Sequence, residues 1–406
     1  MGKSNKIITT LLFFLYPLAA LPLVFSQIIH RHKYAYTLLA IFMGMCAILW
    51  LPSGDLYRHS MTYFQLKDMN YNDFLIFQAL NLDIVLYSIT FAFAKLGINF
   101  EIVRFLFVFI SYQCVFWIYQ DVAQHNEILK NNQYYYKLGF VLMFMSVAFF
   151  NITHGLRYGL AIYISAAGVY KLFWKGQKTG WFFMFFAGLV HFSTFIFIAP
   201  CVMSFLKRTI NKRSIAYLSI AILILGAPAI NNILELLPLP ELLSNRTSQY
   251  TAGYWAQEFF EDHSFKYRIS KFLSYWSIFP LMMISYKNIS RKTSVLTDKM
   301  LLLMIPLLAV AYPFGEIMPR FSYFLIIIYV CSCLTYVNVF IKNKWNLRIV
   351  YFFTILTFIA NIYTFRRELS LSSEYKLLYS PLPTILFYTY SESHINQLID
   401  ETGSYM

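Results

Sequence analysis

Long apolar runs recur along nearly the whole chain. They extend from residue 8 to residue 364, and mostly short polar groups separate them. Many reach the length of about 20 residues that a helix needs to cross a bilayer. The pattern therefore predicts an all-α, polytopic membrane protein with about 12 transmembrane helices, and roughly 10 to 14 as the range.

The first run, at 8–28, follows two lysines and is predicted to be an uncleaved first helix rather than a signal peptide. The later spans are predicted at 34–52, 80–97, 100–120, 134–150, 155–174, 180–205, 214–234, 271–287, 299–313, 320–342 and 347–364. Since apolar runs recur from residue 8 to residue 364, residues 1–406 are predicted to form a single transmembrane domain. The polar segments 53–79 and 235–270 are predicted as extracytoplasmic loops, and 365–406 as a polar C-terminal tail.

Composition agrees with a membrane protein. Of the 406 residues, 59% are hydrophobic and only 13% are charged, about half the charged fraction of a soluble domain. The formal net charge of +14 is interpreted as loop charge that sets topology, not as affinity for nucleic acid. The five cysteines lie in or beside apolar runs, so neither a disulfide framework nor a metal site is indicated, and no cofactor is expected.

One stretch leaves the orientation open. Basic clusters at 171–178 and 207–213 flank the apolar run 180–205, and each is expected on the cytoplasmic side. Either one cluster is not cytoplasmic, or the run doubles back. His191 and Ser193 near its middle would suit two half-helices that meet at a polar break.

Ionisable residues at the mouths of apolar runs are the candidate functional groups, because charge at membrane depth is costly and is usually kept for pairing or function. Asp55 and Arg58 follow the second run and would share a helix face, although Arg58 could equally be a snorkelling loop charge. Asp83 stands at the entry to the third run. It is a further polar group that could hold a sugar.

Two arginines stand in opening turns of predicted helices. His154 and Arg157 begin a narrow face of small residues, and Arg157 is placed to bind an anion beside the helix amides. Arg320 follows Glu316 by four residues, where a simple salt bridge is the plainer alternative. His191 is a further candidate, although a lone membrane histidine is more often a packing residue.

Several arginines at helix mouths suit a phosphate ligand, because guanidinium binds phosphate oxygens bidentately and stays charged. A lipid-linked diphosphate is the natural candidate in a membrane. Its isoprenoid tail would lie between helices while the sugar projects into the polar loops.

The chain resembles the EpsG-like and Wzy-type polysaccharide polymerases of bacterial inner membranes, over most of its length. Each motif behind the resemblance is short, and their order and spacing carry the match. The motifs are Gly54-Asp55 with Tyr57 and Tyr63, Arg157-Tyr-Gly-Leu-Ala161, Leu189-Val-His191-Phe-Ser193 and Arg320-Phe-Ser-Tyr323.

The resemblance implies a GT-C-like membrane glycosyltransferase that makes O-antigen, capsule or exopolysaccharide. Such an enzyme transfers a growing glycan from undecaprenyl diphosphate to a sugar hydroxyl of another lipid-linked repeat unit, on the periplasmic side, without metal. Arg157 and Arg320 carry over as diphosphate clamps and Arg58 as a weaker third. A flippase and a chain-length regulator are the protein partners it implies.

Two questions stay open at the level of sequence. The general base is one of Asp55, Glu316 and His191, and nothing in the sequence chooses among them. The alternative functions are a flippase for lipid-linked oligosaccharide and a membrane O-acyltransferase that modifies surface polysaccharide. Polar residues gathered at span ends favour an enzyme with a one-sided site over a transporter.

Overall fold

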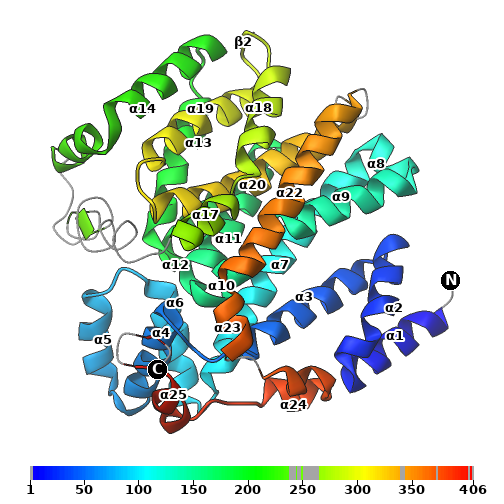
Figure 1. The fold of residues 1–406 in the computed structure, drawn as a ribbon, viewed down its shortest axis with the longest axis vertical. Coiled ribbons are helices and arrows are strands. Elements are labelled where there is room, and N and C mark those ends of the chain that lie inside the picture. Colours follow the sequence, from blue (N-terminus) through cyan, green and yellow to red (C-terminus); the bar gives the residue numbers. More distant parts are fainter. Residues whose placement is uncertain are drawn as a thin grey trace. The chain divides into compact units, whose positions relative to one another are not determined.

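The computed structural model describes residues 3–236, 244, 248–249, 265–338, 343–371, 374–400 and 403–404 (Figure 1). Within these ranges the regular structure is helical, apart from one antiparallel pair of two-residue strands, β1 (Ile210–Asn211) and β2 (Lys292–Thr293). The predicted all-α class is confirmed. The predicted loop 235–270 lies largely outside the described residues.

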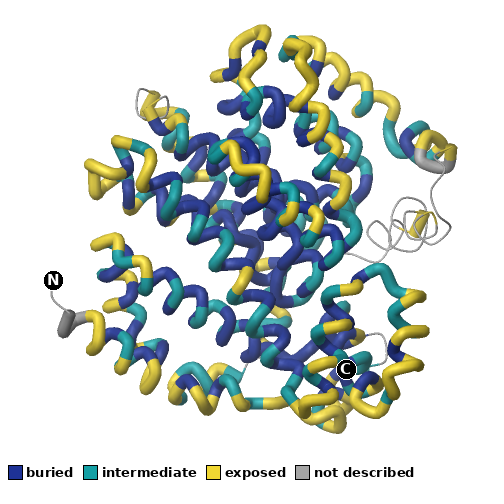
Figure 2. The backbone as a smooth tube through the Cα atoms, turned by 180° about the vertical axis from the view of Figure 1, so that it is seen from behind, coloured by how far each residue is buried: buried dark blue, intermediate teal, exposed yellow. Residues whose placement is uncertain are grey.

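The chain divides into two compact units. Unit 1 comprises residues 1–168, 181–195 and 365–406, and unit 2 comprises 169–180 and 196–364. Each unit has its own buried interior, and buried positions follow the inner faces of its helices (Figure 2).

Unit 1 is built around α7, a long helix that packs along α3 (Figure 1). Aromatic rings fill the space between these helices and α9, with Tyr36 and Phe116 centred 5.6 Å apart. The helices of unit 1 are α1 (Lys3–Leu15), α2 (Pro17–Ile29), α3 (Lys33–Ile48), α4 (Asp55–Asp68), α5 (Tyr71–Ala79), α6 (Ile84–Lys95), α7 (Phe100–His125), α8 (Glu127–Asn131), α9 (Gln133–Met145), α10 (Phe149–His154), most of α11 (Leu156–Phe173), α12 (Gly180–Val190), α23 (Arg366–Leu371), η2 (Tyr375–Tyr379), α24 (Leu382–Leu386) and α25 (Glu392–Leu398).

Unit 2 surrounds α20, an apolar helix whose residues are nearly all buried. The helix α14 is broken at Gly226, where φ is 68° and ψ is −174°, two residues before Pro228, which cannot donate a backbone hydrogen bond. The helices of unit 2 are the end of η1 (Phe192–Phe197), α13 (Ile198–Ser204), α14 (Lys212–Glu235), α17 (Phe265–Leu273), α18 (Ile278–Asn288), α19 (Leu296–Ala311), α20 (Ile317–Thr335) and α22 (Lys344–Thr364).

Four described helices are long and apolar enough to cross a membrane: 100–125, 212–233, 317–335 and 344–364. Other predicted spans correspond to shorter apolar helices. The first predicted span is two helices of 13 residues each, because Pro17 at the start of α2 favours an extended conformation at Tyr16. The twelve-span count therefore stays a prediction.

The predicted break within 180–205 is present. The helix α12 ends at Val190, and the 3₁₀ helix η1 begins at Phe192. At the two ends of this stretch the rings of Phe173 and Phe205, both in unit 2, are centred 5.6 Å apart. The stretch therefore returns to the place where it began, and the basic clusters at 171–178 and 207–213 adjoin the two rings that meet within unit 2.

Candidate functional site

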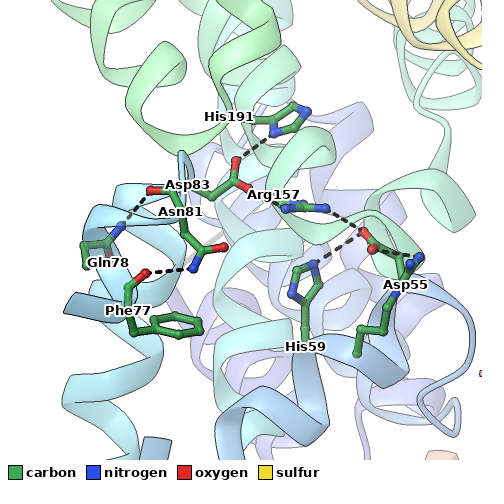
Figure 3. A network of polar contacts seen from close by, with 9 residues as sticks. Asp55, His59, Phe77, Gln78, Asn81, Asp83, Arg157 and His191 are labelled. Atoms are coloured by element: carbon green, nitrogen blue, oxygen red, sulfur yellow. Dashed lines mark hydrogen bonds and ion pairs between the residues drawn. The ribbon is translucent and has the colours of Figure 1, made fainter. Parts of the chain in front are cut away.

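Arg157 lies between two carboxylates in unit 1 (Figure 3). It is the second residue of α11, directly after the turn that ends α10 at His154. A Cβ on Gly159 would lie 2.6 Å from the Cα of Ile152, so only glycine allows α11 to fold back this closely on α10. The tight turn fixes the place of the Arg157 guanidinium.

Asp83 is the more buried of the two carboxylates, with a side chain 6% exposed. Its Oδ2 pairs closely with Nη1 of Arg157, and its Oδ1 lies 2.8 Å from Nδ1 of His191. The loop before it is braced by Asn81, whose side-chain nitrogen donates to the Phe77 carbonyl over 2.8 Å. Asp83 is thus fixed at the start of α6 and joins α6, α11 and the break after α12.

Burial alone would raise the pKa of Asp83, but its hydrogen bond with His191 and the charge of Arg157 outweigh burial and lower the pKa to about 2. The carboxylate is therefore ionised and accepts hydrogen bonds only. His191 accordingly donates from Nδ1, which makes Nε2 its basic nitrogen.

Asp55 is the more accessible carboxylate, with a side chain 32% exposed. It begins α4 directly after Gly54, which has a φ of 57°, and a carboxylate in the first turn of a helix is favoured by the helix dipole. Its oxygens lie 3.3 Å from Nη2 of Arg58, 3.4 Å from Nε2 of His59 and 3.5 Å from Nη2 of Arg157. Against the effect of burial, the charges of His59, Arg157 and Arg58 hold the pKa of Asp55 well below its usual value.

The site has a buried side and an accessible edge. The side chains of Asp83, His191 and His59 are between 4% and 6% exposed. Those of Arg58 and Arg157 are 50% and 21% exposed. A ligand that reaches this edge meets two guanidinium groups on either side of Asp55, which is an arrangement for an anion.

The other predicted site residues have different surroundings. His154 stacks on the ring of Phe365, with centroids 4.9 Å apart, and its Nδ1 lies 3.0 Å from the Phe150 carbonyl. Burial lowers the pKa of His154 to about 4, so it is neutral at physiological pH. Glu316 and Arg320 lie in unit 2, where Glu316 pairs with Lys271.

Two residues of this region were not among those predicted. His59 stands four residues after Asp55, a spacing that places both on one helix face and that the sequence does display. Arg104 is completely buried in α7 and donates from Nη2 to the carbonyls of Ala47 and Trp50, over 2.5 and 2.7 Å. The sequence does show Arg104 as a charged residue inside an apolar run of spanning length, and this feature could have identified it.

The described part of the chain thus combines helices that are long and apolar enough to cross a membrane with a charged site at the mouths of apolar helices. It belongs to the EpsG family, whose model matches residues 33–379. This is a family of polysaccharide polymerases of the glycosyltransferase type. No curated protein and no solved structure matched the chain.

Proposed function

We propose that this chain polymerises the repeat units of a bacterial surface polysaccharide, as a Wzy-type enzyme of the inner membrane. It would transfer the growing glycan from undecaprenyl diphosphate to a hydroxyl of another lipid-linked unit. Besides the family, the observation that supports this best is Arg157, held by a buried carboxylate beside the accessible Asp55 and Arg58.

The reaction breaks the bond between the donor's anomeric carbon and the diphosphate oxygen, and forms a bond from that carbon to the acceptor oxygen. Negative charge grows on the departing diphosphate, so fixed cations near it lower the barrier. Arg157 and Arg58 would supply them, and Asp83 and His191 would hold Arg157 in position. No step in this scheme needs a metal ion.

The acceptor hydroxyl must also lose a proton. We assign Asp55 as the general base that accepts this proton. It is the accessible carboxylate of the site, whereas the His191 side chain is 4% exposed. The Asp55 contact with Arg157 is long, at 3.5 Å, and a phosphate oxygen would replace it. Without that positive partner the pKa of Asp55 rises, which makes it a better base when substrate is bound.

The charges of unit 1 support an extracytoplasmic site. The α2–α3 turn and the turn after α7 lie side by side, because the Arg31 guanidinium donates to the Leu129 and Lys130 carbonyls. The site lies at the other ends of α3 and α7. The basic end is favoured on the cytoplasmic side. That end carries His30, Arg31, His32, Lys33, Lys130 and Lys137 with the acids Asp121 and Glu127. At the site end the described basic residues Arg58, Lys67, Lys95, Arg366, Arg367 and Lys376 are offset by a larger number of acidic residues.

Deletion of the gene separates the proposed function from its alternatives. Loss of a polymerase should leave single repeat units on the lipid acceptor of the cell surface, without long chains. Loss of a flippase would remove the single unit as well, since export precedes polymerisation. Loss of an O-acyltransferase would leave chains of normal length that lack acyl groups. Either of the last two outcomes would refute the proposal.

A further inference from the structure

Gly403 lies against the turn that carries Asp55. The backbone N–H of Gly54 donates to the carbonyl of Gly403 over 2.8 Å. A Cβ on Gly403 would lie 2.9 Å from the Gly54 oxygen and 3.0 Å from its nitrogen. Both glycines have a positive φ, 57° and 88°, so neither position suits another residue.

The approach of these two glycines is part of a larger contact. We use the term C-terminal clasp for residues 388–400 with Gly403 and Ser404. The hydroxyl of Tyr57, one turn into α4, donates to Oδ1 of Asn396 over 3.2 Å. Leu51 and Tyr57 share a buried cluster with Tyr390, Ile395 and Ile399 of the clasp.

The clasp and the α3–α4 turn are both fastened to α7. Arg104 donates to the Trp50 carbonyl, and Glu101 of the same helix accepts the backbone N–H of Tyr390 over 3.3 Å. The Tyr390 hydroxyl donates to the Leu49 carbonyl over 3.1 Å. The segment from Leu49 to Gly54 is therefore held by α7 on one side and by the clasp on the other.

The side-chain contacts of Asp55 are all between 3.3 and 3.5 Å, longer than a well-formed charged hydrogen bond. Its place consequently depends on the backbone of the turn, and the bond from Gly54 to Gly403 holds that backbone one residue before Asp55. We propose that the C-terminal clasp, through Gly403, is a positioning element that sets Asp55 toward Arg157. This inference rests on the proposed function, in which Asp55 accepts the proton.

The test compares Gly403→Ala with Gly97→Ala. Gly97 also has a positive φ, 68°, but a Cβ there would meet nothing within 4 Å, so its alanine carries similar backbone strain without disturbing the turn. Purified full-length protein would be given lipid extract from cells that lack the polymerase and accumulate its lipid-linked repeat unit. Chain growth would be measured against substrate concentration and pH.

For Gly403→Ala we expect kcat to fall about ten- to a hundredfold with little change in KM. The acid limb of its pH–rate profile should move to higher pH, because a displaced Asp55 loses its positive neighbours. Gly97→Ala should match the parent in both. Equal behaviour of the two variants would overturn the proposal, because backbone strain alone would then explain the loss.

A second variant covers the case in which Gly403→Ala does not accumulate. Asn396→Ala removes only the bond to Tyr57 and should shift the acid limb in the same direction by a smaller amount. An unshifted profile would contradict the positioning role. Failure of the proposed function is distinguishable, because the parent protein itself would then not elongate chains. If only the assignment of Asp55 as base is wrong, Asp55→Asn would still elongate chains, whatever the clasp variants do.

Discussion

Asp83 and His191 stand 108 positions apart in the chain, and their side chains are joined over 2.8 Å between Oδ1 and Nδ1. The same carboxylate holds Arg157, so the break after α12 and the start of α6 act together on one guanidinium.

We expect Asp83→Asn to slow chain growth about ten- to a hundredfold, since Arg157 then loses its closest partner. Unfolding should be easier by about 3 kcal/mol, because a largely buried charge is left with a weaker contact. Chain growth is measured as polysaccharide chain length, and stability is measured by thermal unfolding in detergent. Asp73→Asn changes an exposed carboxylate of the same unit and serves as the control. Equal effects from the two substitutions would contradict the role of Asp83.

The pH dependence of stability follows from Asp83. Its pKa of about 2 in the folded protein lies below the ordinary 3.8, so folding favours the ionised form. The stabilisation, about 2 kcal/mol, is complete above pH 4 and is lost as the pH falls toward 2. Thermal unfolding between pH 7 and pH 2.5 should show a steeper loss for the parent than for Asp83→Asn. Parallel curves would mean that the pKa of Asp83 is not lowered.

The orientation of unit 1 is open to labelling with a membrane-impermeant thiol reagent in a cysteine-free background. Asp68→Cys, on the exposed end of α4, should react in intact spheroplasts. Lys130→Cys should react only after the membrane is permeabilised, because it lies at the basic end. In unit 2, Lys178→Cys and Arg208→Cys should react alike, since the run between them doubles back. The opposite reactivity of Asp68→Cys and Lys130→Cys would place the site in the cytoplasm.

Independence from metal is also a prediction. If guanidinium groups neutralise the departing diphosphate, chain growth by purified protein should continue in the presence of a chelator. The rate with excess chelator should stay within about twofold of the untreated rate. Loss of activity that only a divalent ion restores would contradict the mechanism.

The sequence predicted most residues of the site, but it did not predict which of the distant ones pair with one another. Asp55, Asp83, Arg157 and His191 each stand out as polar groups at or within apolar runs, and the break at His191 is visible as polar residues in such a run. Their pairing is a tertiary property, because the partners of Arg157 are 74 and 102 residues away. The sequence did not single out Gly403 as a member of the site region. The close approach of a glycine to a distant backbone segment leaves no recognisable local sequence pattern. The division of an apolar run into two helices was not predicted, because such a break depends on a single residue, as at Pro17.

The role of Arg320 as a second diphosphate clamp stays a prediction. It lies in the opening turn of α20, and its neighbour Glu316 pairs with Lys271 in unit 2. Arg320→Lys and Arg320→Ala should both shorten chains if the guanidinium fork binds phosphate. Normal chains from Arg320→Lys would mean that only its charge matters.

The central claim, that Arg157 clamps the diphosphate, is tested most directly by the pair Arg157→Lys and Arg157→Ala. Lysine keeps the charge but lacks the planar fork that reaches Asp83 and a phosphate oxygen together. Loss of one such contact in the transition state costs about 2 to 4 kcal/mol, roughly thirty- to a thousandfold in rate. The measurement is polysaccharide chain length in a strain lacking the native gene, complemented with each variant at matched membrane levels. We predict single repeat units and no long chains from both variants, whereas normal chain lengths from Arg157→Lys would contradict the account.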